Sequence, residues 1–290
     1  MTKIREDVTT KIVRSRLQIH VAVLLFGLAG LFGKLLTLSP FIIVAGRTLF
    51  AAAALLIYAK LQHIGLASRF RLILVFVLLG GLLAFHWVAF FRAIQLSTVA
   101  IGLLTFSSFP LFVTILEPRF FGTRINTKDV IAVLVIIAGL ILVMPAFHFG
   151  RQDTQGAVWG VFSGLSFAIL QMANRKIVQR TSPIQLAFYQ NGFACLFLLP
   201  FCSFGQCQPD LRQWLLLLIL GVLCTAVAHT LFIQGLRRVT TQWASLISTL
   251  EPVYGIALAA LLLHEIPSLR TLAGGLIILG TTAFISFQRN

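Results

Sequence analysis

The sequence predicts an all-α integral membrane protein with about ten transmembrane helices in two inverted five-helix repeats. Of its 290 residues, 58% are hydrophobic and only 11% are charged, whereas a soluble domain carries roughly a quarter charged residues. Apolar runs of about 20 residues, long enough to cross a bilayer as helices, recur from Ile19 onward with short connections. An apolar run with a central proline also occurs once in each half.

The distribution of Lys and Arg supports ten spans. With the N-terminus in the cytoplasm, most of the 23 Lys and Arg residues fall in the segments on the cytoplasmic side of the membrane. We therefore expect a multi-pass protein of the cell (inner) membrane with both termini cytoplasmic. Cations facing anionic lipid also account for the net charge of +15 without nucleic acid. The expected spans are 19–38, 41–61, 70–91, 97–121, 128–147, 156–175, 184–204, 213–236, 242–263 and 270–288.

The stretches 98–123 and 240–265 indicate an internal repeat. Pro110 and Pro252 are 142 residues apart, and the same offset places Thr98 on Thr240. Five spans per half, an odd number, send the second half through the membrane in the opposite direction. Inverted repeats with broken helices at matching positions are typical of secondary transporters, whose site lies near the membrane midplane between the repeats. The expected organisation is a cytoplasmic N-terminus over 1–18 and repeats over 19–147 and 156–288.

A set of small, apolar and turn residues recurs in both halves: Ala93-Ile94, Ser97, Pro110, Ala138-Gly139, Gly235-Leu236, Thr240, Glu251-Pro252, 261–265, Gly274 and Gly280. With these residues the chain resembles the EamA-type members of the drug/metabolite transporter superfamily. The family's usual Gly-Glu turn is altered, since the first half has Gly122-Thr123 and the second has His264-Glu265. The resemblance implies ten helices in two inverted five-helix repeats and a central cavity lined by helices one to four and six to nine, with the fifth and tenth peripheral. It also implies export of small metabolites or amino acids.

Glu251 is the strongest candidate for a coupling residue. A carboxylate at membrane depth is costly and by default functional, with a partner or a proton. Helical spacing places Trp243, Glu251 and Tyr254 within one arc, which suits a cavity wall. The alternative is that Glu251 only satisfies an Arg or the helix-end donors freed by Pro252.

Arg47 and two histidines are further ionisable candidates within the spans. Arg47 lies about 9 Å below the expected outer end, where it could bind a substrate carboxylate or pair with Glu251. The alternative is that it reaches back to the outer headgroups, as we expect for Lys34. His86 and His229 occupy nearly equivalent places in the two halves and are candidates for proton transfer or coupling; the alternative is a hydrogen bond to a backbone carbonyl.

Aromatic and amide side chains complete the expected cavity lining. Such a mixed lining suits an amphipathic solute rather than a bare ion. The additional lining residues that we expect are Trp87 and Phe90 in the third span, Gln171 in the sixth, Tyr189 and Asn191 in the seventh, and Trp243 and Tyr254 in the ninth.

The sequence lacks motifs for other functions. It has no GxxxxGK[ST] and no metal-ligand spacing, so we expect neither ATP, a metal nor another cofactor. The alternative function, an intramembrane enzyme acting on a lipid-linked substrate, would need paired deep acids. Only Glu251 is expected to be deep, since Glu117 is expected to form an interfacial ion pair with Arg119. A disulfide between Cys202 and Cys207 is left open.

We therefore expect a secondary transporter rather than an enzyme. Its partners are a small-molecule substrate and the lipid bilayer, without nucleic acid. A homodimer through the peripheral helices is left open, because surface helices are equally apolar whether they meet lipid or a second copy.

Overall fold

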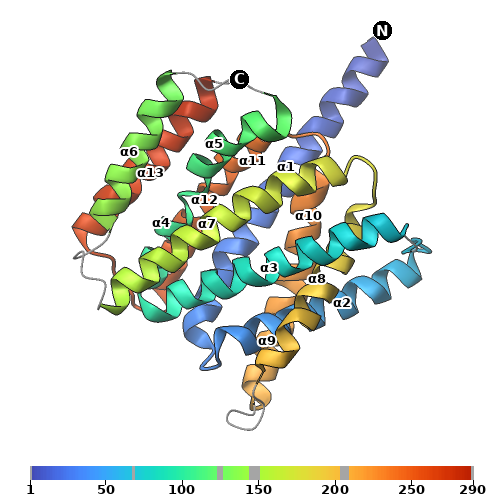
Figure 1. Ribbon diagram of the computed structural model, residues 1–290, viewed down its shortest axis with the longest axis horizontal. Helices are drawn as coiled ribbons and strands as arrows, with labels where there is room; N and C mark the ends of the chain where they lie inside the picture. Colours follow the sequence, from blue (N-terminus) through green and yellow to red (C-terminus); the bar gives the residue numbers. More distant parts are fainter. Residues whose placement is uncertain (1, 67–68, 123–126, 144–150, 203–208, 289–290) are drawn as a thin grey trace.

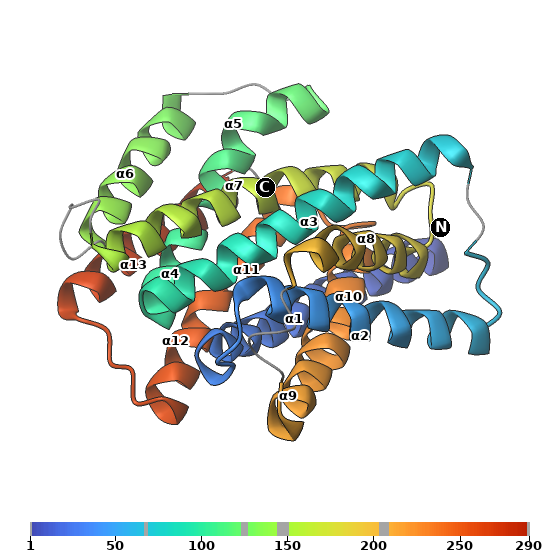
Figure 2. The ribbon, with the colours of Figure 1, turned by 60° about the horizontal axis from the view of Figure 1, so that its bottom comes forward.

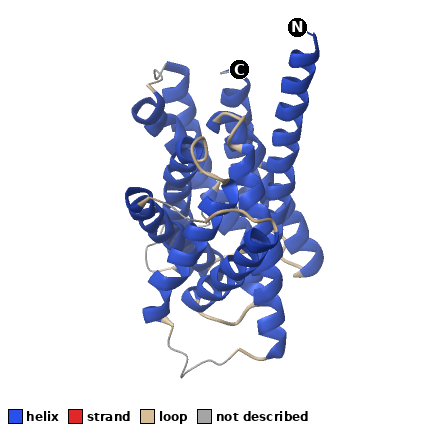
Figure 3. Cartoon of the chain, turned by 90° about the vertical axis from the view of Figure 1, so that its right-hand side faces the viewer, coloured by secondary structure: helices blue, strands red, loops and turns tan. Residues whose placement is uncertain are grey.

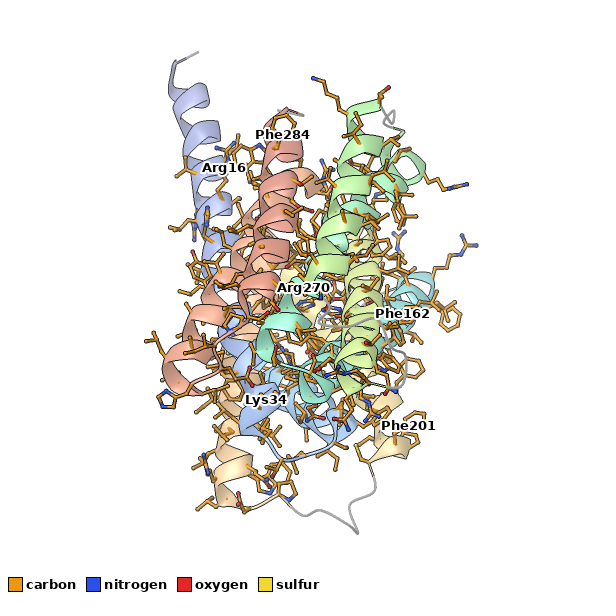
Figure 4. All side chains as sticks on the ribbon, turned by 90° about the vertical axis from the view of Figure 1, so that its left-hand side faces the viewer. Arg16, Lys34, Phe162, Phe201, Arg270 and Phe284 are labelled. Atoms are coloured by element: carbon orange, nitrogen blue, oxygen red, sulfur yellow. The ribbon has the colours of Figure 1, made fainter. Side chains whose placement is uncertain are left out.

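A computed structural model describes residues 2–66, 69–122, 127–143, 151–202 and 209–288, and these residues form helices and turns without a strand (Figures 1 and 3). The first helix begins and the last helix ends at one end of the bundle, which we call the N-terminal end. Figure 4 places Arg16 and Phe284 toward this end and Lys34 and Phe201 toward the opposite end. Cys207 lies outside the described residues, so the pairing of Cys202 is not addressed.

Eight helical runs within the described residues are long and apolar enough to cross a membrane. Two further apolar helices, in α6 and α13, are shorter. The prediction of an all-helical membrane protein is confirmed, and the prediction of about ten spans is met in part. The elements are α1 (Thr2–Leu35), α2 (Pro40–Leu61), α3 (Phe70–Leu96), α4 (Val99–Phe106), α5 (Phe109–Phe121), α6 (Thr127–Val143), α7 (Gln152–Ile177), α8 (Pro183–Leu198), η1 (Leu199–Phe201), α9 (Leu211–Gly221), η2 (Val222–Val227), α10 (Ala228–Gly235), α11 (Thr241–Ser248), α12 (Leu250–Leu262) and α13 (Leu269–Gln288).

Two spans are broken at matching positions. Helices α4 and α5 form one of these spans, and α11 and α12 form the other. Thr98 and Thr240, which are 142 residues apart, cap α4 and α11, and each side chain accepts a hydrogen bond from the backbone N–H three residues later. Pro110 and Pro252 lie in the first turns of α5 and α12, where a missing N–H removes no helical hydrogen bond. The predicted interruption of both helices is therefore confirmed.

Each broken span ends at a residue with left-handed backbone. Gly122 follows α5 with a φ of 70°, and His264, again 142 residues later, has a φ of 55°. This conformation favours glycine because glycine has no Cβ. The first half therefore has glycine at this position, whereas the second half has His264 in the same left-handed conformation. Glu265 follows directly and turns back toward the bundle.

The helices pack mainly against helices of the other half. Helix α7 packs against α3, α4 and α5, while α1 packs against α10, α11 and α12. Glycines permit close crossings: a Cβ on Gly27 would lie 2.9 Å from the carbonyl oxygen of Glu251, and one on Gly156 would lie 2.8 Å from that of Ala93. Helices α6 and α13 pack against each other at the side of the bundle (Figures 1 and 2).

Candidate functional site

A cavity of about 30 Å³ lies among helices of both halves, and four ionisable side chains line it: Arg47, His86, His229 and Glu251. A buried water needs roughly 10–15 Å³ of such volume, so the cavity holds about two waters. Pockets for small-molecule ligands measure about 300–1,000 Å³, so the site is closed around too small a space for a metabolite. The other lining residues are Phe26, Ala29, Leu83, Trp87, Phe90, Phe106, Phe167 and Leu170.

Arg47 is held inside the protein by η2 and by an aromatic ring. Its side chain is only 1% exposed, so it does not reach the headgroup region. Its Nε donates a hydrogen bond to Thr225 Oγ1 at 2.8 Å, and Nη2 donates to the Cys224 carbonyl at 3.3 Å. The guanidinium carbon lies 3.9 Å from the centre of the Trp87 ring, a favourable cation–π geometry. The charge is therefore fixed in place at the cavity.

The residues that hold Arg47 belong to an irregular turn. Helices α9 and α10 are joined by η2, a π-helix, and π-turns inside α-helices often occur at functional sites. Thr225 Oγ1 donates to the Leu220 carbonyl five residues earlier and accepts from Arg47. Gly221 lies next to this turn, and a Cβ there would lie 2.8 Å from the Arg47 carbonyl. The close crossing of α2 and α9 and the π-turn together position the guanidinium.

Glu251 lies in the first turn of α12 and is 3% exposed. It interacts electrostatically with Arg47. Among the described residues, no donor forms a hydrogen bond with its carboxylate and no cation pairs with it directly. The predicted arc with Trp243 does not hold, because the helix is interrupted at Thr249. The carboxylate thus remains open toward the cavity and in the field of one cation.

The two histidines each have a hydrogen-bond partner. His86 Nδ1 lies 3.0 Å from both the carbonyl oxygen and Oγ of Ser163. His229 Nε2 donates to Gln190 Oε1 at 2.9 Å, and Gln190 Nε2 donates to Asn174 Oδ1 at 2.6 Å. The backbone-carbonyl partner considered for the histidines is present for His86, whereas His229 begins a buried chain of amides that leads away from the cavity.

Five residues of the expected lining lie outside this cavity, and three of them make hydrogen bonds to backbone carbonyls of a helix or of the loop before α3. Gln171 donates to the Thr241 carbonyl at 2.9 Å. The Tyr189 hydroxyl donates to the Leu66 carbonyl at 2.8 Å, and the Asn191 amide donates to the carbonyl four residues earlier. These polar groups serve helix contacts in this structure rather than the cavity wall.

The other two are the aromatic residues of the ninth span. Trp243 lies near the N-terminal end, where the Arg16 guanidinium is 4.2 Å from its ring centre. Tyr254 faces α1, since a Cβ on Gly27 would lie 2.9 Å from the Tyr254 Cβ. The break between α11 and α12 separates Trp243 from Glu251. Tyr254 lies on the same helix as the acid, three residues later, but it does not line the cavity.

Several polar residues at or near the site were not expected. Thr225, Gln190 and Ser163 interrupt apolar runs, which is the signal that marks them in the sequence. Glu117 is 1% exposed and accepts a hydrogen bond from the Thr241 hydroxyl at 2.8 Å. Helix α11 of the other half therefore covers this acid, and the expected ion pair with Arg119 stays a prediction.

A separate hollow of about 840 Å³ opens at the N-terminal end of the bundle. Most of its charged wall comes from the segments that follow α7 and α10. Arg237 is occupied there, since it donates to the carbonyls of Val178 and Thr181. This end of the bundle is strongly basic, because five basic side chains line the hollow: Arg175, Lys176, Arg180, Arg237 and Arg238.

Comparison with known proteins gives matches along the chain. The model of the EamA-like transporter family matches twice, at residues 16–144 and 154–287. An uncharacterized transporter of Bacillus subtilis (strain 168) is 26% identical over 277 residues, which cover 93% of this chain and 88% of that protein. The matches thus reach both halves of the chain.

Two relatives carry more specific names. The pseudopaline exporter of Pseudomonas aeruginosa is 24% identical, covering 79% of this chain and 80% of that protein. The S-adenosylmethionine uptake transporter of Rickettsia conorii is 26% identical, covering 74% and 72%. A crystal structure with 19% identity superposes with a TM-score of 0.70 over 94% of this chain and 96% of the other, which shows a shared fold.

Proposed function

The chain belongs to the EamA-like transporter family, and from this premise we propose that it exports a small metabolite or an amino acid by alternating access around the central cavity. The observation that carries the proposal is the cavity itself. One fixed cation, one open carboxylate and several aromatic rings, contributed by both halves, meet there.

The charges of the cavity suit a substrate that carries both signs. Arg47 presents a guanidinium that can take a carboxylate, and guanidinium–carboxylate pairs are strong and directional. Glu251 presents an acid that can take an ammonium group. The rings of Trp87 and Phe90 supply an apolar surface between them. An α-amino acid or a similar zwitterionic metabolite fits this arrangement.

The small volume of the cavity supports a transport cycle with moving helices. At about 30 Å³ the site must widen to take a metabolite and must open toward one side at a time. Broken helices at matching positions of two inverted repeats provide segments that can move for this purpose. The breaks between α4 and α5 and between α11 and α12 are the candidate hinges.

We assign proton coupling to Glu251. A carboxylate that binds a proton when the cavity faces one side and releases it toward the other would couple substrate flux to the proton gradient. The family resemblance favours export. Since one relative is named an exporter and another an uptake transporter, direction has to be measured in oriented vesicles.

The N-terminal end is proposed to face the cytoplasm of a cell with the protein in its inner membrane. The basic hollow at this end agrees with the rule that cytoplasmic segments collect Lys and Arg. Reporter fusions placed after Asn290 should be active only on the cytoplasmic side. A reporter that is active only outside the cell would show that the N-terminal end faces outward, which contradicts the proposed orientation in the membrane.

The central test is flux in proteoliposomes with the wild type and Arg47→Ala. We expect the variant to bind amino acids more weakly than the wild type does. Its affinity for the corresponding decarboxylated amines should equal that of the wild type. Arg47→Lys, which retains the charge but not the planar pair of bonds, should be intermediate. Equal loss for acids and amines, or no loss, would remove Arg47 from carboxylate binding.

A further inference from the structure

The two helices that Thr98 and Thr240 cap, α4 and α11, are each contacted by an acid from the other half. Glu265 Oε2 accepts a hydrogen bond from the backbone N–H of Val99 at 2.9 Å. Glu117 Oε1 accepts one from the Thr241 hydroxyl at 2.8 Å. Val99 and Thr241 are the first residues of α4 and α11. The first contact lies beside Lys34, toward the opposite end (Figure 4), and the start of α11 lies near Arg16, toward the N-terminal end, so the two contacts lie at opposite ends of the bundle.

The contact at the opposite end includes a lysine. Lys34 Nζ donates to the Ser97 carbonyl at 2.6 Å and lies 4.0 Å from Glu265 Oε1. The first N–H groups of a helix have no partner within it and carry a partial positive charge, so a carboxylate is stabilised there. The tip of α1, the turn after α12 and the start of α4 are thereby joined.

The contact at the N-terminal end is more deeply buried. Glu117 interacts electrostatically with Arg175 of α7 and holds the first hydroxyl of α11. Gln171 of α7 donates to the carbonyl of the same residue, Thr241, at 2.9 Å. The start of α11 is thereby tied to α5 and α7.

Both contacts cross one seam of the bundle. Helices α3, α4, α5 and α7 pack together, as do α1, α10, α11 and α12; we call these the first and second helix groups. Val99 and Glu117 belong to α4 and α5 of the first group, and Ser97 lies between α3 and α4. Lys34 and Thr241 belong to α1 and α11 of the second group, and Glu265 lies in the segment after α12. The cavity lies along the same seam, between Trp87 and His86 on one side and Glu251 and His229 on the other.

We propose that Glu265 and Glu117 are the two gating residues of the transport cycle. Glu265 closes the opposite end and Glu117 closes the N-terminal end, and the two contacts are released in turn. Separating the groups at either end breaks only the contact at that end, and with both contacts formed the cavity is closed on both sides. This inference rests on the proposed alternating access.

The experiment uses one reporter in the cavity. The four native cysteines are replaced by alanine, and Ala29→Cys is introduced, because Ala29 lines the cavity and is 3% exposed. A membrane-impermeant thiol reagent is then applied to right-side-out and to inside-out vesicles. The labelling rate from each side reports how often the cavity opens toward that side.

Shifts at opposite ends are expected from the two gates. Glu265→Ala should speed labelling from the opposite end about tenfold, and Glu117→Ala should speed it from the N-terminal end by a similar factor. Tenfold is the change that one charge-assisted hydrogen bond supports. In each variant the rate from the other side should not rise, because the contact at that side is intact and the population that opens at one end is drawn from the other states. Glu265→Gln and Glu117→Gln keep the size and one acceptor, and should shift the rates in the same directions by less.

Exposed charged residues at each end serve as controls. Arg212→Ala at the opposite end and Arg119→Ala at the N-terminal end should leave both rates unchanged. Gate variants that speed labelling equally from both sides, or that change neither rate, would overturn the gating assignment and leave only a structural role. If the thiol introduced by Ala29→Cys is labelled from neither side in any variant, alternating access through this cavity fails, and the proposed function fails with it.

Discussion

Gly221 sets how closely α2 and α9 cross, and alanine at this position should destabilise the protein and displace Arg47. A Cβ there would lie 2.6 Å from the Phe50 Cβ and 2.8 Å from the Arg47 carbonyl oxygen. The second contact is with backbone, so α2 itself has to move. Overpacking of this kind costs about 1–3 kcal/mol, while the helix propensity of alanine returns at most about 1 kcal/mol. The net loss should be about 1–2 kcal/mol.

Thermal unfolding in detergent measures this loss, with Gly280→Ala as the matched control. A Cβ on Gly280 meets nothing within 4 Å, so this variant should be as stable as the wild type or more so. At about 2–4 °C per kcal/mol, Gly221→Ala should unfold about 2–8 °C lower. It should also bind carboxylate substrates more weakly, because Arg47 moves with α2. A Gly221→Ala protein as stable as the control would refute the close crossing.

Three further variants test single contacts of the site. Thr225→Val removes the acceptor of Arg47 Nε, and the KM for a carboxylate substrate should rise at least about tenfold, since a bond to a charged group is worth about 1.5–3 kcal/mol; an unchanged KM would contradict the role of the π-turn. Glu251→Gln should leave substrate flux independent of pH, because the amide cannot exchange a proton; persistent pH dependence would exclude this coupling residue. Gln190→Leu should lower stability by about 1–3 kcal/mol, because His229 loses a buried partner, and an unchanged melting temperature would contradict that hydrogen bond.

Conservative variants separate these effects from general damage. Thr225→Ser keeps the hydroxyl that Arg47 uses and should retain the wild-type KM. Glu251→Asp keeps an ionisable acid and should retain pH-dependent flux, with a changed rate because the shorter side chain withdraws the carboxyl group from the cavity.

The charged part of the cavity was predictable from the sequence because charge is rare within the spans. Arg47 and Glu251 cannot face hydrocarbon without a high cost, so an inward position is expected wherever the rest of the helix lies. Tyr189 and Asn191 carry no such constraint. Polar side chains are spread around their helix rather than gathered on one face, so the sequence does not indicate which face meets the cavity, and both residues lie elsewhere.

The contacts between halves were not predictable from local sequence. The run from Gly221 to Val227 predicts an ordinary apolar helix, and the partner of its π-turn, Arg47, lies far away in the chain. Glu117 stands near the end of an apolar run beside Arg119, a pattern typical of a membrane interface. Only the position of α11, a helix of the other half, buries it.

Because helices of one half pack mainly on helices of the other half, the order in which the protein assembles in the membrane is constrained. Gly27 fits against α12 and Gly80 fits against α8, both of which are synthesised after the helix they pack on. The first half therefore enters the membrane with these close-packing surfaces unfilled, although domains generally fold in the order of their synthesis. Its core is completed only when the second half has been inserted. Assembly of this protein should thus be a single late event rather than two successive ones.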